Sequence, residues 1–140
     1  MFDESRLRTI RPLIIEDEKE TMDSIFSLFD KMFDEFYIAR NGEEGLYRFY
    51  KENPDVIITD LQMPFMSGFR MIERIRIENS TIPVIIITAY SEKEHIEKAR
   101  SLNVLEYFVK PFDVDGLFKT IYQSCYPSFS GKIDLDQFTL

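Results

Sequence analysis

Five side chains that could take part in chemistry stand at the ends of short apolar segments. Glu16 and Asp17 follow the first segment, Asp60 follows the third, Thr88 lies near the end of the fourth, and Lys110 follows the fifth. Two unit charges about 4 Å apart repel by roughly 4 kcal/mol at an effective dielectric constant of about 20, so three clustered carboxylates require a proton or a cation. Oxygen ligands suit Mg²⁺, which commonly binds carboxylates, water and a substrate phosphate. These residue types therefore predict phosphoryl transfer, with Lys110 as a second positive charge.

The apolar segments have the composition of buried strands. They are rich in β-branched and aromatic residues and cover residues 13–15, 36–39, 56–59, 84–89 and 107–109. The third and fourth segments are apolar at successive positions, which is typical of a parallel sheet covered on both faces. Because ligands of such sheets bind outside the carboxyl ends of the strands, the five polar side chains are expected to meet there.

Helical periodicity fills the intervals between these strands. Apolar residues recur at helical spacing within residues 22–33, 46–50, 71–75, 96–102 and 117–121. Asn41 is expected to cap the second helix, Ser91 with Glu94 to form a capping box for the fourth, and Asp113 to cap the fifth. The pattern predicts a (βα)₅ chain, and right-handed crossovers then give a doubly wound α/β sandwich.

Composition narrows the functional classes. A chain of 140 residues has room for one domain, and its net charge of -8 disfavours nucleic acid and anionic membrane surfaces as partners. The longest apolar run, residues 82–90, is far shorter than the roughly 18 residues that a membrane span needs. Cys125 is the only cysteine, so a reducing cytoplasm is the expected location, and its side chain is expected to be a small buried apolar group.

Three segments are expected along the chain. Residues 1–10 form an N-terminal extension, residues 11–125 the domain, and residues 126–140 a tail. The tail begins with proline, serine and glycine and then alternates apolar with polar residues, which predicts a linker followed by an extra strand or a docking segment.

The residues around the five polar side chains form a specific set of motifs. The chain resembles the receiver domain of two-component response regulators over residues 11–125. The resemblance rests on the pair Glu16 and Asp17, on DLQMPFMSG at residues 60–68, on Thr88 with Ala89, and on YFVKP at residues 107–111. It implies the flavodoxin-like strand order 2-1-3-4-5 and a cis peptide bond between Lys110 and Pro111.

The resemblance implies a role for each residue of the acidic site. Asp60 would be the nucleophile that accepts a phosphoryl group from a histidine kinase, a phosphotransfer protein or a small phosphodonor. Asp17 and Asp60 would bind Mg²⁺ through carboxylates, Gln62 through its backbone carbonyl, and Glu16 mostly through water. Lys110 would hold the transferring oxygens and offset their charge.

The resemblance also implies a switch. Thr88 and Tyr107 would move after phosphorylation and change the face formed by the fourth helix, the fifth strand and the fifth helix, where a downstream protein binds. Gln62 and Tyr90 would tune the lifetime of the phosphoryl group. Such a domain acts in signalling and catalyses only the modification of its own Asp60 and its reversal.

Other functions are weaker or stay open. A phosphatase of the haloacid dehalogenase type would carry a second aspartate where Gln62 stands. A nucleotide- or flavin-binding domain would have a phosphate-binding loop after the first strand, where this chain has Glu16, Asp17, Glu18 and Glu20. A receiver that binds proteins independently of phosphorylation remains an alternative. His95, the single histidine, is expected on the protein surface without a catalytic role.

Overall fold

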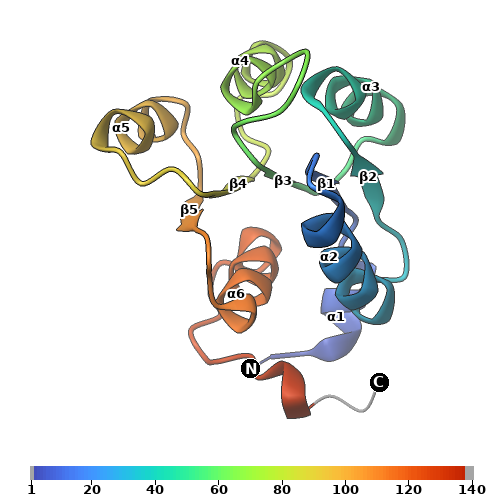
Figure 1. Cartoon of the computed structure of the whole chain (residues 1–140). Coiled ribbons are helices and arrows are strands. Elements are labelled where there is room, and N and C mark those ends of the chain that lie inside the picture. Colours follow the sequence, from blue (N-terminus) through green and yellow to red (C-terminus); the bar gives the residue numbers. More distant parts are fainter. Residues whose placement is uncertain (1, 138–140) are drawn as a thin grey trace.

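One parallel sheet forms the centre of the molecule. The computed structural model describes residues 2–137, and the strands of its sheet are β1 (Pro12–Ile15), β2 (Tyr37–Ala39), β3 (Val56–Thr59), β4 (Val84–Thr88) and β5 (Glu106–Val109). They are hydrogen-bonded in the order β2-β1-β3-β4-β5 (Figure 1). This confirms the expected fold class and strand order.

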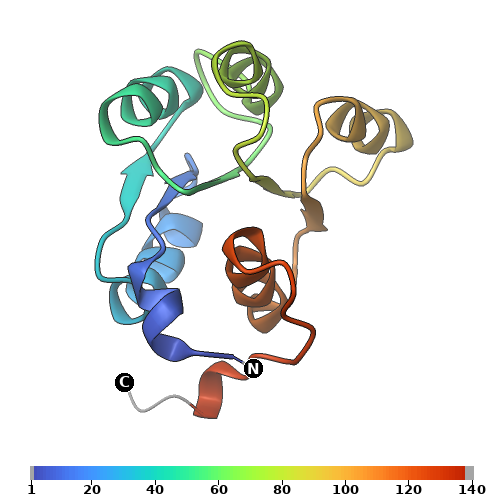
Figure 2. The same ribbon diagram turned by 180° about the vertical axis from the view of Figure 1, so that it is seen from behind.

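Helices cover both faces of the sheet. In the described residues they are α1 (Glu4–Thr9), α2 (Lys19–Met32), α3 (Gly42–Glu52), α4 (Gly68–Glu78), α5 (Lys93–Ser101) and α6 (Val114–Cys125). Helices α3, α4 and α5 lie on one face, and α1, α2 and α6 lie on the other (Figures 1 and 2). None of the helices within residues 2–137 is long and apolar enough to cross a membrane.

Two apolar cores explain why the central strands are continuously apolar. Leu13 and Ile57 pack with the helices of one face, whereas Ile14 and Ile58 pack with those of the other. The central strands β1, β3 and β4 therefore bury both sets of alternating side chains, as strands of parallel sheets do. In the second core, Phe118 of α6 packs against α2.

Two of the three helix caps that the sequence predicted are present in the structure. Asn41 accepts a hydrogen bond from the backbone of Glu44 at 2.9 Å, and Asp113 accepts one from the backbone of Asp115 at 3.2 Å. The capping box at Ser91 was a wrong prediction. The N-cap of α5 is Glu92 instead, because the first turn of the helix closes on the Glu92 carbonyl. The Glu92 side chain makes no cap hydrogen bond.

Both terminal segments pack onto α6. Leu7 of α1 is fully buried, and the ring of Phe2 lies 4.9 Å from that of Tyr122. In the tail, Phe129 and Ile133 are buried and the chain forms a 3₁₀ helix at Leu135–Gln137. The described part of the tail is thus a docking segment without the extra strand, and residues 138–140 lie outside the described chain. The division into segments at residues 10 and 125 stays a prediction.

Cys125 differs from its expected environment. Its side chain is exposed, because Cys125 is the last residue of α6 and the buried stripe of that helix ends at Tyr122. The expectation of a buried cysteine was wrong.

Replacing Leu7 with alanine tests whether the N-terminal helix is part of the folding unit. Because Leu7 is fully buried in the core beside α6, Leu7→Ala should lower the free energy of unfolding by about 2–5 kcal/mol. Thr9→Ala, at an exposed position of the same helix, should change it by less than about 0.5 kcal/mol. Urea unfolding followed by circular dichroism measures both. Equal stability of Leu7→Ala and the wild type would show that α1 is dispensable.

Candidate functional site

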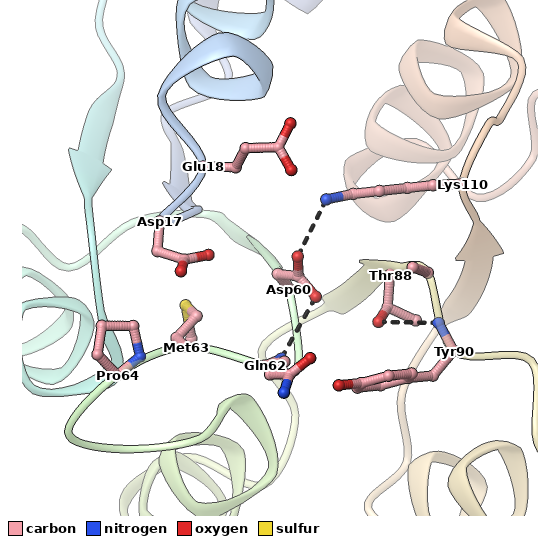
Figure 3. A pocket seen from close by; sticks show the side chains of 10 residues that line it. Asp17, Glu18, Asp60, Gln62, Met63, Pro64, Thr88, Tyr90 and Lys110 are labelled. Atoms are coloured by element: carbon pink, nitrogen blue, oxygen red, sulfur yellow. Dashed lines mark hydrogen bonds and ion pairs between the residues drawn. The ribbon is translucent and has the colours of Figure 1, made fainter.

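The strand ends bring the predicted chemical residues to one edge of the sheet. Register pairs Ile15 of β1 with Thr59 of β3, so that the residues that follow these two strands emerge next to each other. A cavity of about 630 Å³ opens there and is lined in part by Asp17, Asp60 and Lys110. Figure 3 shows their side chains converging on the cavity.

Lys110 bridges two carboxylates at this edge. Its ammonium group donates hydrogen bonds to Glu16 at 2.7 Å and to Asp60 at 3.0 Å. Glu16 is 1% exposed and Asp60 is 8% exposed, so water screens these charges poorly. The structure thus joins three of the residues that the sequence placed at the ends of different strands.

Burial and hydrogen bonding shift the pKa values of Glu16 and Lys110. Desolvation raises the pKa of Glu16, and the neighbouring Asp60 adds to the rise, while the hydrogen bond from Lys110 opposes it. Desolvation tends to lower the pKa of Lys110, but its hydrogen bonds to Glu16 and Asp60 outweigh that tendency and leave the pKa raised. Lys110 therefore stays a cation at neutral pH.

The carboxylates form a cluster suited to a hard metal ion. Glu16, Asp17 and Asp60 each have a carboxylate oxygen within 4.8 Å of the others. One ammonium group neutralises only part of this charge, and a donor set made of oxygen atoms fits Mg²⁺. Asp17 is exposed and extends the cluster toward solvent.

Asp60 is held firmly from its own loop. One carboxylate oxygen of Asp60 accepts hydrogen bonds from the backbone of Leu61 at 2.6 Å and of Gln62 at 3.4 Å. Gly68 is required nearby, since any β-carbon at that position would collide with the carbonyl oxygen of Asp60. The glycine in the sequence motif thus lets helix α4 begin directly against Asp60.

Thr88, Tyr90 and Tyr107 form a connected group on another side of the cavity. The Thr88 hydroxyl accepts a hydrogen bond from the backbone of Tyr90 at 3.4 Å, and the Tyr107 hydroxyl donates one to the Tyr90 carbonyl at 2.6 Å. Burial, together with the charges of Glu92 and Asp60, raises the pKa of Tyr107, so this hydroxyl remains a donor. The Lys110–Pro111 peptide bond is cis, as the resemblance implied.

His95 is more closely tied to the cavity than the sequence indicated. It is half-buried, and its ring stacks on Tyr90 at 5.2 Å and on Phe69 at 6.0 Å. Its Nδ1 lies 3.3 Å from a carboxylate oxygen of Glu92. One signal was present in the sequence, because His95 stands one helical turn before Ala99, which belongs to the apolar stripe of α5.

Replacing Glu16 with glutamine should stabilise the fold in Mg²⁺-free buffer, and the gain should grow as the pH rises. Because the pKa of Glu16 is raised in the folded state above its ordinary value of 4.5, the folded protein binds this proton more tightly than the unfolded chain. The stability that Glu16 contributes is full below pH 4.5 and is lost as the pH rises through the raised pKa. The Glu16→Gln variant has no carboxyl group at this position, so it does not lose stability in this way as the pH rises.

Urea unfolding from about pH 4 to about pH 7 in the presence of a chelator measures this difference. Glu18→Gln, which removes an exposed carboxylate beside the same cavity, serves as the control and should show a much smaller pH dependence. A gain for Glu16→Gln that is the same at every pH would contradict the explanation.

Comparison with known sequences identifies a common family. The model of the response regulator receiver domain matches residues 13–122. Sporulation initiation phosphotransferase F of Bacillus subtilis is 34% identical over 103 residues, which cover 74% of this chain and 83% of that protein. Regulatory protein AtoC of Escherichia coli is 35% identical over 107 residues, which cover 76% of this chain and 23% of AtoC.

Solved structures give the same result. The N-terminal domain of an uncharacterized protein from Wolinella succinogenes superposes with a TM-score of 0.80 and 33% identity, over 85% of this chain and 96% of that one. The receiver domain of a Francisella response regulator superposes with a TM-score of 0.79 and 25% identity, over 86% of this chain and 100% of that one. The chain therefore belongs to the family of response regulator receiver domains.

Proposed function

We propose that this domain accepts a phosphoryl group on Asp60 in a Mg²⁺-dependent reaction and passes the signal to a downstream protein. The observation that carries the proposal is the hydrogen bond of 3.0 Å between Lys110 and Asp60 beside two further carboxylates. A carboxylate that faces a cavity, with a fixed ammonium on one side and a candidate cation site on the other, is equipped to attack phosphorus.

Asp17 and Asp60 would hold Mg²⁺ through their carboxylates and Gln62 through its backbone carbonyl, while Glu16 would contact it mostly through water. The ion would cancel the repulsion between the acceptor carboxylate and the incoming phosphoryl oxygens. The chain itself positions the carboxylates, because Glu16 is fixed by Lys110 and Asp60 is fixed by its own loop.

Transfer would form a bond between a carboxylate oxygen of Asp60 and phosphorus. At the same time the bond from phosphorus to the donor breaks, and its electron pair stays with the histidine nitrogen of a kinase or phosphotransfer protein. Lys110 would hold the phosphoryl oxygens as charge develops on them, and the Thr88 hydroxyl would bond another. With a single cysteine in the chain, the reaction would take place in a reducing cytoplasm.

The output would follow from the link between Thr88 and Tyr107. Both residues contact Tyr90, so a Thr88 that turns toward the phosphoryl group would disturb the partner of Tyr107. The face of α5, β5 and α6 would change with them and bind the downstream protein. Exposed Leu105 and Val109 provide apolar contact area on this face.

Phosphorylation of Asp60 is the first outcome to test. Incubation with acetyl phosphate and Mg²⁺ should add the mass of one phosphoryl group to the wild type. Asp60→Asn should gain none, and Asp17→Asn should react much more slowly because it lacks a metal ligand. Mass spectrometry of the intact protein, with and without a chelator, measures the reaction. An unmodified wild type under every condition would favour a phosphorylation-independent interaction module.

Removing the Tyr90 ring should shorten the lifetime of the phosphoryl group. Tyr90 lines the cavity, and Figure 3 shows its ring and the Gln62 side chain on the side of Asp60 away from Lys110. The ring would shield phosphorus from water, so Tyr90→Ala should lose the label faster than the wild type. Tyr47→Ala, which removes an exposed tyrosine on α3, is the control. Equal decay rates for wild type and Tyr90→Ala would rule out shielding.

A further inference from the structure

Phe65 adopts a backbone conformation that a bulky residue rarely takes. Its φ angle is 69°, in the left-handed region. The backbone of Met66 donates a hydrogen bond to the Pro64 carbonyl at 2.8 Å, which closes a three-residue γ-turn centred on Phe65. A γ-turn with positive φ is rare and strained, and glycine or asparagine would adopt this conformation at lower cost.

The surrounding chain enforces this turn. At the base of the loop, the backbone of Gly68 donates a hydrogen bond to the Leu61 carbonyl at 2.8 Å. After Phe65, Met66 packs so closely on Gly42 that a β-carbon at position 42 would lie 2.6 Å from the Met66 carbonyl oxygen. Both ends of the loop are therefore fixed, and the strain at Phe65 has no route to relax.

Packing of the Phe65 side chain does not offset this strain. It is 84% exposed, although aromatic rings stabilise folds mainly through burial. The strain and the exposed ring together lower the stability of the isolated domain. A strained, exposed aromatic residue is instead typical of a recognition site.

Phe65 stands at the rim of the acceptor cavity. The two residues before it, Met63 and Pro64, line the cavity that contains Asp60. A protein that brings a phosphorylated histidine to Asp60 must cover this rim, because phosphorus has to reach bonding distance of the carboxylate. A small phosphodonor enters a cavity of about 630 Å³ without covering the tip of the loop.

We propose that Phe65 is a specificity-determining contact for the protein that donates the phosphoryl group. Its ring would enter an apolar recess beside the phosphohistidine of that protein, and the rigid turn would present the ring in a fixed direction, which limits the entropic cost of binding. This inference rests on the proposed function of Asp60. A downstream target need not approach the acceptor carboxylate, so the donor is the partner that the position of Phe65 favours.

The test compares two kinds of phosphodonor on three variants. Phe65→Asn accepts positive φ but lacks the ring, Phe65→Tyr keeps the ring, and Ile77→Ala removes another exposed apolar side chain. Ile77 lies about 14 Å along α4 from Gly68, at 1.5 Å per residue. Acetyl phosphate with Mg²⁺ serves as the small donor. The histidine kinases and phosphotransfer proteins encoded in the same genome, purified and phosphorylated, serve as the protein donors.

Phe65→Asn should slow transfer from the protein donor by about tenfold, the loss expected for one apolar anchor, and leave labelling by acetyl phosphate unchanged. Phe65→Tyr should retain most of the transfer, and Ile77→Ala should match the wild type with both donors. Thermal unfolding of Phe65→Asn should occur at the same temperature as in the wild type or higher, because the turn is relieved.

Three results would overturn the inference. One is transfer from the protein donor at the wild-type rate in Phe65→Asn. Another is an equal loss with both donors, which would mean that the substitution disturbs Asp60 through the loop. The third is a wild-type chain that acetyl phosphate labels but no phosphohistidine protein does. Only the absence of labelling by every donor would overturn the proposed function of Asp60 as well.

Discussion

The ammonium group of Lys110 is shared between two buried carboxylates, and this bridge governs the electrostatics of the whole cavity. Removing these charges from water is costly, and the short contacts of 2.7 Å and 3.0 Å offset only part of that cost. Asp17 adds a third carboxylate, and Lys110 is the one lysine among the described residues that line the cavity. A phosphoryl anion alone would meet net negative charge here, whereas a divalent cation would meet a ready set of oxygen ligands. The arrangement therefore favours the entry of a cation and a phosphoryl group together over either an empty cavity or an anion alone.

The positions of these charges follow from the sheet. Parallel strands in register end at one edge, so residues as far apart in sequence as Glu16 and Lys110 become neighbours. The sequence predicted this much because successive apolar residues indicate strands buried on both faces, and because the polar residue that follows a buried strand has to emerge at its end. Stability comes from the two apolar layers on either side of the sheet. Because the apolar layers stabilise the fold, the edge of the sheet can hold an electrostatically costly site without unfolding the domain.

Features that depend on contacts between distant segments could not be predicted in this way. The amphipathic pattern of α6 extends to Cys125, but only the packing of the last turn decides that this residue is exposed. The tail alternates like a strand, yet Phe129 and Ile133 are buried in the core that contains α6, and its described part, residues 126–137, forms no strand. The strained turn at Phe65 was also invisible, since phenylalanine gives no local signal for positive φ. In each case tertiary contacts outweigh the local preference of the residues.

Burial is uneven around the cavity, and the surrounding elements therefore differ in how easily they can rearrange. Strand β3 is buried along its whole length and Asp60 is fixed by its own loop, whereas β5 has exposed ends and α5 buries only Ala99 among its residues. The less buried elements have the smaller free energy of local rearrangement. They are also the elements joined to the cavity through Tyr107 and through the ring of His95 stacked on Tyr90. A charge can bias only an element that has a second arrangement within reach. A new anion on Asp60 would therefore leave the buried β3 side in place and shift the conformational equilibrium of α5 and β5.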